Sequence, residues 1–146
     1  MTDLDDLLHD TAVDLRMATF RLTRRLRRER AGDNLSDAHF AVLGNLNLHG
    51  RLAIGELAQR ERVSAPTMSN TVDALVESGL VVRVPSEEDR RRVYIEITEA
   101  GTSVVTATVH KRDAALADAL ADLYFTDEEL RVLREAAALI RKVAER

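Results

Sequence analysis

The feature that most constrains the fold is a central stretch in which two short helical segments are followed at once by two strand-like segments. Residues 54–60 and 64–77 carry apolar side chains at helical spacing. Residues 80–84 are mostly apolar and β-branched, and residues 92–98 alternate apolar with polar side chains. Small Ala58 suits a steep crossing of the two helices. We therefore expect a helix-turn-helix followed directly by a β-hairpin.

Long amphipathic segments flank this centre on both sides. One stripe of the first segment recurs at steps of three and four, an arginine-rich stretch ends it, and Gly32-Asp33-Asn34 then interrupts the pattern. The stripe consists of Leu4, Leu8, Thr11, Leu15, Ala18, Leu22 and Leu26. Ser36, Thr98 and Thr126 are placed as N-caps of further helices. The further elements that we expect are a helix over 4–26, a helix over 36–50, an extended piece at 52–53, a helix over 98–123 and a helix over 126–144. The expected fold class is mainly α with a small β-hairpin wing, a winged helix-turn-helix between N- and C-terminal dimerisation helices.

Composition narrows the classes of chemistry open to the chain. Aromatic residues make up 3% and Trp is absent, so aliphatic residues and Ala must fill the core, which favours helix. The absence of Cys excludes disulfides, thiolate metal sites and thiol redox sensing. The acidic start MTDLDDLLHD does not resemble a signal peptide, and no apolar run approaches the roughly 20 residues of a membrane span. We expect a cytoplasmic protein.

The distribution of charge is more informative than its sum. The net charge is -4, whereas many nucleic-acid-binding proteins are basic. Nearly all basic residues are Arg, whose planar fork suits phosphates and base edges, although a high-GC genome would also enrich Arg. Acidic residues gather toward both ends of the chain, where they would either keep DNA at the centre or form a solvated face.

The segment 64–77 presents a face of short, mostly polar side chains. Short side chains let a helix lie deep in the major groove, where its N-terminal residues contact bases. Asn70 can bond adenine bidentately, and the Thr67 methyl can meet a thymine methyl. The first role expected of Ser64 is that of an N-cap, and Thr67 or Ser69 taken alone would be equally consistent with a solvent-facing position. The residues of this segment that we expect at DNA are Ser64, Pro66, Thr67, Ser69 and Asn70.

The loop between the strands carries consecutive arginines directly after acidic residues. Arg90 and Arg91 follow Glu87, Glu88 and Asp89. Guanidinium groups at a hairpin tip are suited to a minor groove or to phosphates, and Asp89 is close enough to orient an arginine two residues on. A soluble turn of alternating charge is the alternative. Because the hairpin follows a helix-turn-helix, we assign Asp89, Arg90 and Arg91 to DNA binding.

The terminal helices carry more apolar side chains than a small central unit can cover. We expect a two-fold dimer to bury them, with an intramolecular helical bundle as the alternative. A dimer would place two recognition helices about one helical turn of DNA apart. The apolar residues of the last two helices are Val104, Val105, Val109, Leu116, Leu120, Leu123, Leu130, Leu133, Ala137, Ile140 and Val143.

A candidate effector pocket lies where the helices over 4–26, 36–50 and 98–123 would meet the central unit. Its candidate residues are Met17, Phe20, His39, Phe40 and Leu43, although such residues at helical spacing are more often core. The four His residues have no metal-ligand spacing, and no phosphate loop or nucleophile pattern is present. We therefore expect no metal, no cofactor and no enzymatic activity.

Together these residues resemble the MarR family of transcriptional regulators, the multiple-antibiotic-resistance type. The resemblance rests on IGELAQRERVSAPTMSNTVDALVESGLVVR, DRRRVYIEIT and the following EAG, and it extends over nearly the whole chain. It implies a recognition helix over 64–78, a wing in which Arg91 reaches the minor groove, and support of that arginine by Asp89. It also implies a homodimer on a palindromic operator, usually a repressor relieved by a small molecule.

The expected organisation is one domain over 1–146. Within it, 36–101 would be the DNA-binding lobe, and 1–35 with 102–146 the helical dimerisation lobe. The expected function is sequence-specific regulation of transcription on double-stranded DNA, as a homodimeric repressor. The alternative is a winged-helix module that binds protein partners without DNA, which the negative net charge and the balanced charges of the wing would suit.

Overall fold

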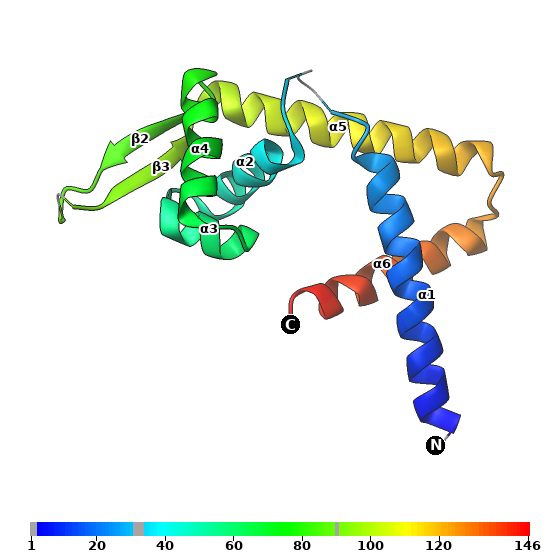
Figure 1. Cartoon of the computed structure of the whole chain (residues 1–146). Coiled ribbons are helices and arrows are strands. Elements are labelled where there is room, and N and C mark those ends of the chain that lie inside the picture. The colour runs from blue at the N-terminus through cyan, green and yellow to red at the C-terminus, as the bar shows by residue number, and fades with distance from the viewer. Residues whose placement is uncertain (1–2, 31–33, 90) are drawn as a thin grey trace. The chain divides into compact units, whose positions relative to one another are not determined.

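The computed structural model describes residues 3–30, 34–89 and 91–146, and it contains the elements expected from the sequence in the expected order. Figure 1 labels them along the chain. Their bounds are α1 Asp3–Leu26, α2 Asp37–His49, β1 Leu52–Ala53, α3 Ile54–Glu61, α4 Ala65–Glu77, β2 Val81–Pro85, β3 Val93–Ile97, α5 Glu99–Asp122 and α6 Asp127–Ala144. The mainly helical fold class with a β-hairpin wing is confirmed.

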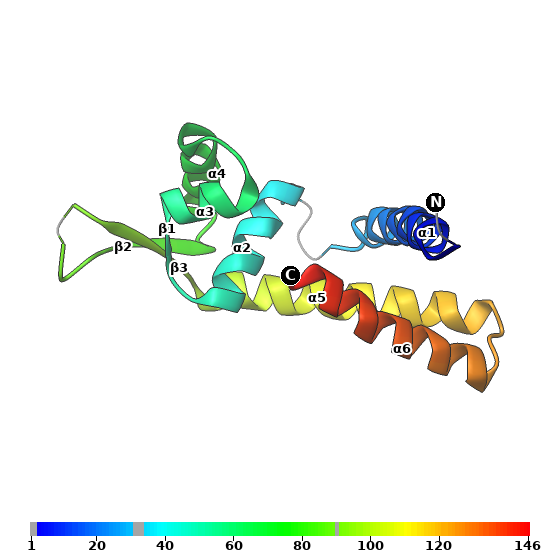
Figure 2. The same cartoon turned by 90° about the horizontal axis from the view of Figure 1, so that it is seen from below.

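The strands form a three-stranded antiparallel sheet in the order β1-β3-β2. β2 and β3 are the two strands of the hairpin, and Arg83 is paired with Ile95 in their register. β1 pairs with the other edge of β3 through Leu52 and Ile95 (Figure 2). The sequence predicts an extended piece at 52–53, but its pairing with β3 depends on how the intervening α3, α4 and β2 turn the chain back.

The hydrophobic core lies among α2, α3, α4 and the sheet. Its fully buried side chains include Leu43 of α2, Leu57 of α3, Val72 of α4 and Ile95 of β3. These apolar side chains recur on one face of each element, so burying them fixes how α3 and α4 stand against the sheet. Val63 lies in the turn between α3 and α4 and is 40% exposed, and its backbone N–H donates to the Ala58 carbonyl.

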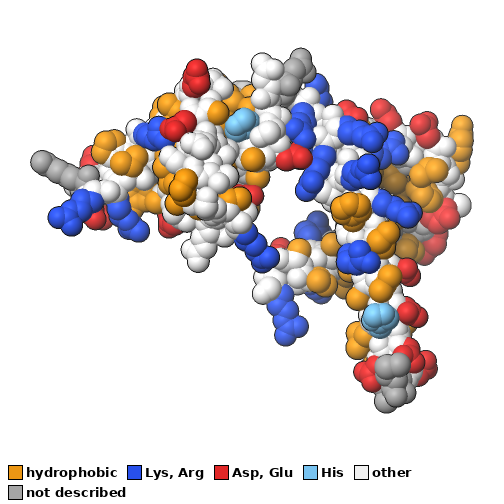
Figure 3. Space-filling model, in the orientation of Figure 1, with side chains coloured by type: hydrophobic (Ala, Val, Ile, Leu, Met, Phe, Trp, Pro, Cys, Tyr) orange, Lys and Arg blue, Asp and Glu red, His pale blue; other side chains and the backbone are white. Residues whose placement is uncertain are grey.

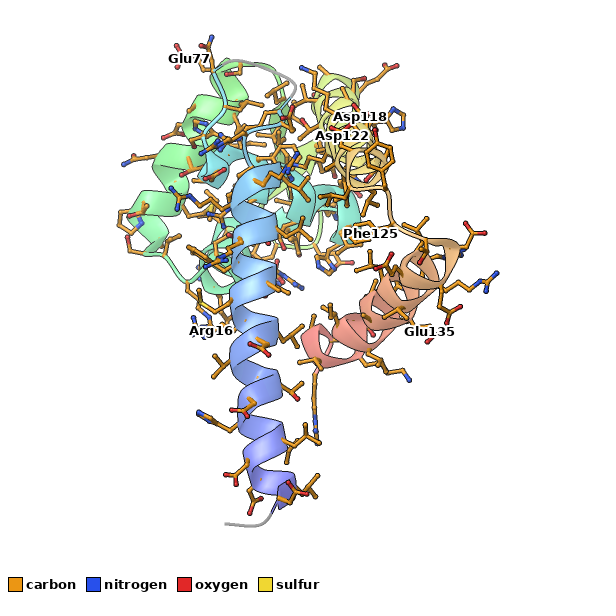
Figure 4. All side chains as sticks on the ribbon, turned by 90° about the vertical axis from the view of Figure 1, so that its right-hand side faces the viewer. Arg16, Glu77, Asp118, Asp122, Phe125 and Glu135 are labelled. Atoms are coloured by element: carbon orange, nitrogen blue, oxygen red, sulfur yellow. The ribbon has the colours of Figure 1, made fainter. Side chains whose placement is uncertain are left out.

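The chain divides into two compact units, residues 1–112 and 113–146. The second unit contains the end of α5 and all of α6, with Leu116, Leu120, Leu130 and Ile140 half-buried. Its other side chains include exposed acidic groups, of which Figure 4 labels Asp118, Asp122 and Glu135.

Candidate nucleic-acid interface

The polar face of α4 begins at a well-capped turn. Ser64 has extended backbone, and its hydroxyl accepts a hydrogen bond from the Thr67 N–H at 3.3 Å. The Ser64 and Thr67 hydroxyls also lie 2.8 Å apart. Pro66 occupies the first turn, where its missing N–H leaves no partner unsatisfied. The caps fix where α4 starts, so the side chains that follow have a defined direction.

The buried and exposed faces of α4 separate as the sequence predicts. Met68, Val72 and Leu75 are buried against the core, whereas Asn70 is exposed and Ser69 is half-buried. Ser64, Pro66 and Thr67 are exposed as well. The predicted residues of this helix are therefore available on its outward side, and their contact with DNA stays a prediction.

The hairpin loop is held by a short set of hydrogen bonds. The Asp89 carboxylate accepts from the backbone N–H of Arg91 at 3.0 Å, and the Asp89 carbonyl accepts from the Arg92 N–H at 2.9 Å. Asp89 thus shapes the loop backbone rather than gripping the Arg91 guanidinium. Arg91 is exposed, and Arg90 lies outside the described residues. Figure 3 shows Lys and Arg side chains gathered beside the tip of the hairpin.

Two basic residues beside α4 are not among the DNA-binding residues predicted from the sequence. Arg83 of β2 donates a hydrogen bond to the Asp73 carboxylate of α4 at 2.5 Å. Arg62, in the turn before α4, has a left-handed backbone with φ of 54°. The Asp73–Arg83 pair depends on the sheet lying beside the helix, so spacing alone does not reveal it. The sequence signal at Arg62 is that the short turn between the two predicted helices contains no glycine, so a residue with a side chain must take any left-handed position there.

A pocket of about 280 Å³ lies among α1, α2 and α5. Its lining residues are Thr23, Leu26, Arg27, Asp37, Phe40, Ala41 and Arg112. Of the residues predicted for an effector pocket, Phe40 lines it. Leu43 is enclosed in the core, and His39 completes the capping box of α2 with Ser36. Met17 and Phe20 are exposed on α1, outside the lining of this pocket.

Basic side chains outnumber acidic ones around this pocket. Arg30 forms an ion pair with Asp37, and Arg27 lies 4.0 Å from the same carboxylate. The Arg112 guanidinium stands 4.6 Å from the centre of the Phe40 ring and donates to the Glu29 carbonyl. Partial burial, and then the nearby charge of Arg30, lower the pKa of Arg112 from its ordinary value. The pocket therefore combines an apolar wall with an excess of positive charge.

Within the described ranges, no group of three or more His, Asp or Glu side chains is placed to hold a metal ion. The helices in the same ranges are also too short or too polar to cross a bilayer.

Comparison with known proteins agrees with this geometry. The sequence model of the MarR family matches residues 33–92. A helix-turn-helix transcriptional regulator of Mycobacterium bovis is 35% identical over 129 residues, 88% of this chain and 89% of the relative. The transcriptional repressor MdtR of Bacillus subtilis is 24% identical over 145 residues, 99% of this chain and 92% of the relative.

Solved structures give the same result at the level of the fold. A MarR family protein from Bacillus stearothermophilus matches with a TM-score of 0.80 and 25% identity, over 100% of this chain and 99% of that protein. The family consists of transcriptional regulators and not of enzymes. With its capped α4, its arginine-bearing wing and these relatives, the chain belongs to the MarR family of winged helix-turn-helix, DNA-binding transcriptional regulators.

Proposed function

We propose that the chain is a homodimeric repressor that binds a palindromic operator and releases it when a small-molecule effector binds. The observation that carries the proposal is the capped helix α4, whose polar face is free beside an arginine-bearing wing. In this proposal α4 enters the major groove with Ser64, Pro66, Thr67, Ser69 and Asn70. The loop of Asp89, Arg90 and Arg91 reaches the backbone or the minor groove.

The terminal helices support the dimer. The structure describes every residue of α1 and α6, and neither helix has a buried one. Covering these apolar side chains with a second copy would stabilise the pair, and a two-fold pair of α4 helices reads a palindrome. Their exposed large apolar side chains are Leu4, Leu7, Leu8, Val13, Met17, Phe20, Leu22, Val132, Leu133, Leu139 and Val143.

Repression is supported by the name of the Bacillus subtilis relative, MdtR, a transcriptional repressor that the chain matches over nearly its whole length. The effector is supported by the pocket beside Phe40. Since the guanidinium groups of Arg27 and Arg112 line the pocket beside one lining carboxylate, Asp37, which is already paired with Arg30, the pocket is suited to an anion with an apolar or aromatic body.

DNA binding by the wing is tested with a mobility-shift assay on DNA flanking the protein's own gene. Arg91→Ala should weaken binding and reduce the dependence of affinity on salt, because one phosphate contact is lost. Lys142→Ala, which removes one exposed charge from α6, is the control. Equal affinity of Arg91→Ala and the unsubstituted protein at several salt concentrations would remove the wing from the interface. Absence of any shift at low salt would favour the protein-interaction module.

The effector is tested by a thermal-shift screen of aromatic carboxylates against the full chain. A binding compound should raise Tm and release operator DNA, and Arg112→Ala should lose both effects while still binding DNA. A compound that raises Tm equally in Arg112→Ala would place its site elsewhere.

A further inference from the structure

The recognition helix has no positive charge of its own. Between Val63 and Val82 the sequence contains no Lys, Arg or His, while Asp73 and Glu77 of α4 are both exposed. Figure 4 labels Glu77 near the end of this helix. A helix in the major groove lies between two phosphate backbones, whose attraction for positive charge supplies much of the binding energy. In this chain the charge that holds α4 in a groove must therefore come from neighbouring elements.

Arg62 stands two residues before the cap of α4 in an uncommon conformation. Its φ of 54° is left-handed, which glycine adopts freely and a residue with a side chain rarely does. Its backbone N–H donates to the carbonyls of Ala58 and Gln59, so the turn itself needs only the backbone. The Arg62 side chain is exposed, and none of the described residues pairs with its guanidinium. Strain retained at an exposed charged residue points to a role for its side chain.

Arg83 reaches α4 from the side. It lies on β2, and its guanidinium donates to the Asp73 carboxylate at 2.5 Å, although the two side chains remain 37% and 57% exposed. The pair is too exposed to contribute much to stability. It has two other effects: it neutralises the carboxylate of Asp73, which would repel DNA, and it restricts the direction of the guanidinium. One fork of Arg83 is occupied, and its other N–H groups are available to a second anion.

We propose that Arg62 and Arg83 are phosphate anchors of the recognition helix, one at its start and one beside its middle, and that Asp73 is the positioning residue of Arg83. The ligand is the sugar-phosphate backbone and not a base edge, because both arginines project from outside α4. The proposal rests on the assignment of α4 as the recognition helix.

Asp73→Asn gives opposite results for the two roles that Asp73 can have. If Asp73 only repels DNA, removing its charge tightens binding. If it holds Arg83, binding weakens roughly three- to tenfold, although the protein has become more positive. Fluorescence anisotropy with operator DNA distinguishes the two. Tighter binding by Asp73→Asn would overturn the positioning role.

A double-mutant cycle tests whether Asp73 acts through Arg83. Arg83→Ala should lower affinity by the same factor on operator and scrambled DNA and reduce the salt slope by about 1. In the Arg83→Ala background, Asp73→Asn should no longer weaken binding, because no guanidinium remains to be positioned. Arg83→Lys should retain part of the salt slope. A loss confined to operator DNA would show base reading instead and would contradict the proposal.

Arg62→Gly separates the side chain from the backbone. Glycine relieves the left-handed conformation, so the variant should be at least as stable as the unsubstituted protein in thermal unfolding. Its affinity for DNA should nevertheless fall roughly tenfold and its salt slope by about 1. Arg134→Ala, which removes an exposed charge from α6, is the matched control and should leave the salt slope unchanged. Unchanged binding by Arg62→Gly would remove Arg62 from the interface.

The failure of these anchors can be told apart from the failure of the recognition-helix assignment. If α4 does not enter the groove, Asn70→Ala and the anchor variants all bind DNA as the unsubstituted protein does. If the anchors alone are wrong, Asn70→Ala still relaxes base preference, whereas Arg62→Gly and Arg83→Ala have no effect.

Discussion

At the scale of single residues, Gly101 is the described glycine with the least room for a side chain. A Cβ built there would lie 2.2 Å from the Leu80 carbonyl oxygen and 2.7 Å from a side-chain carbon of Ile97. The Leu80 backbone cannot shift easily, because its carbonyl also accepts a hydrogen bond from the Thr98 N–H at 3.0 Å. The first turn of α5 therefore packs directly on the backbone that follows α4.

Gly101→Ala should lower the free energy of unfolding by about 1–3 kcal/mol, the usual range for overpacking a tight site. Urea unfolding measures it. Gly44→Ala is the matched control, since a Cβ at Gly44 of α2 meets nothing within 4 Å. Alanine is the better helix former by roughly 0.5–1 kcal/mol, so the control should gain stability. A neutral Gly101→Ala would mean that the two segments separate without cost.

Ser64 gives a second prediction at this scale. Ser64→Ala removes the acceptor of the Thr67 N–H and should cost about 1 kcal/mol of stability. It should also weaken DNA binding, because the start of α4 is less well defined. Ser78→Ala, which removes a hydroxyl bonded to the Ala74 carbonyl at the other end of α4, is the comparison for urea unfolding. Equal losses in the two variants would argue against a special role for the N-cap.

The roles that could be predicted from the sequence are those that depend on contacts between residues close together in the chain. Each predicted N-cap side chain accepts a hydrogen bond from the backbone N–H three residues further along the chain, so these caps could be predicted from local sequence. The structure confirms Ser36, Ser64 and Thr126 in this role. Asp73 and Arg83 are joined only because β2 lies beside α4. Val63 is exposed because the turn is closed by its backbone and not by its side chain.

At the scale of elements, the end of α1 is attached to α5 through backbone carbonyls. Lys111 donates to the Arg30 carbonyl at 3.0 Å, and Arg112 donates to the Glu29 carbonyl at 3.2 Å. Arg30 in turn donates to the Leu35 carbonyl just before α2. These bonds connect the residues that follow α1 to α5 and to the residues before α2.

Replacing both Lys111 and Arg112 with Ala should therefore loosen this junction more than the core. Hydrogen exchange of the peptide covering Arg27, Arg28 and Glu29 should become faster, while the amides of buried α2 residues remain protected. The control is Arg131→Ala, which breaks only the exposed pair with Glu128 on α6. Uniformly faster exchange throughout the chain would indicate global destabilisation and contradict a local role.

The elements themselves follow closely from periodicity and caps. Predicted and observed bounds of α2, α4 and α6 agree to within a residue or two, because each helix has its own polar cap. The strands were expected one residue away from their observed starts, at 80 and 92 instead of 81 and 93. Where a strand begins is decided by its partner's hydrogen bonds, which the sequence of one strand does not specify.

At the scale of the whole molecule, the proposed dimer depends on the exposed leucines of α1 and α6. Leu8→Glu and Leu139→Glu should each convert a dimer to a monomer, because a carboxylate would be buried in the interface. Light scattering during size exclusion measures the mass. Leu48→Glu, at an even more exposed leucine of α2, is the control and should remain a dimer. A monomeric unsubstituted protein would sink the dimer proposal.

The predicted division assigns DNA binding to residues 36–101 and dimerisation to residues 1–35 with 102–146. It stays a prediction. In the structure α1 belongs to the same compact unit as α3, α4 and the hairpin.

Most of the residues that line the pocket could not be predicted from the sequence. The pocket forms where Arg27, just after α1, meets Phe40 of α2 and Arg112 of α5, and only the packed chain brings those positions together.

The tight joint at Gly101 has a mechanical consequence. The Thr98 hydroxyl donates to the Gly79 carbonyl at 2.8 Å, its N–H donates to the Leu80 carbonyl, and Gly101 leaves no gap between the two segments. The start of α5 and the end of α4 must therefore turn as one rigid body. With α4 in a groove as proposed, a force that tilts the first turns of α5 would change the angle at which α4 meets the DNA, because these bonds transmit the motion.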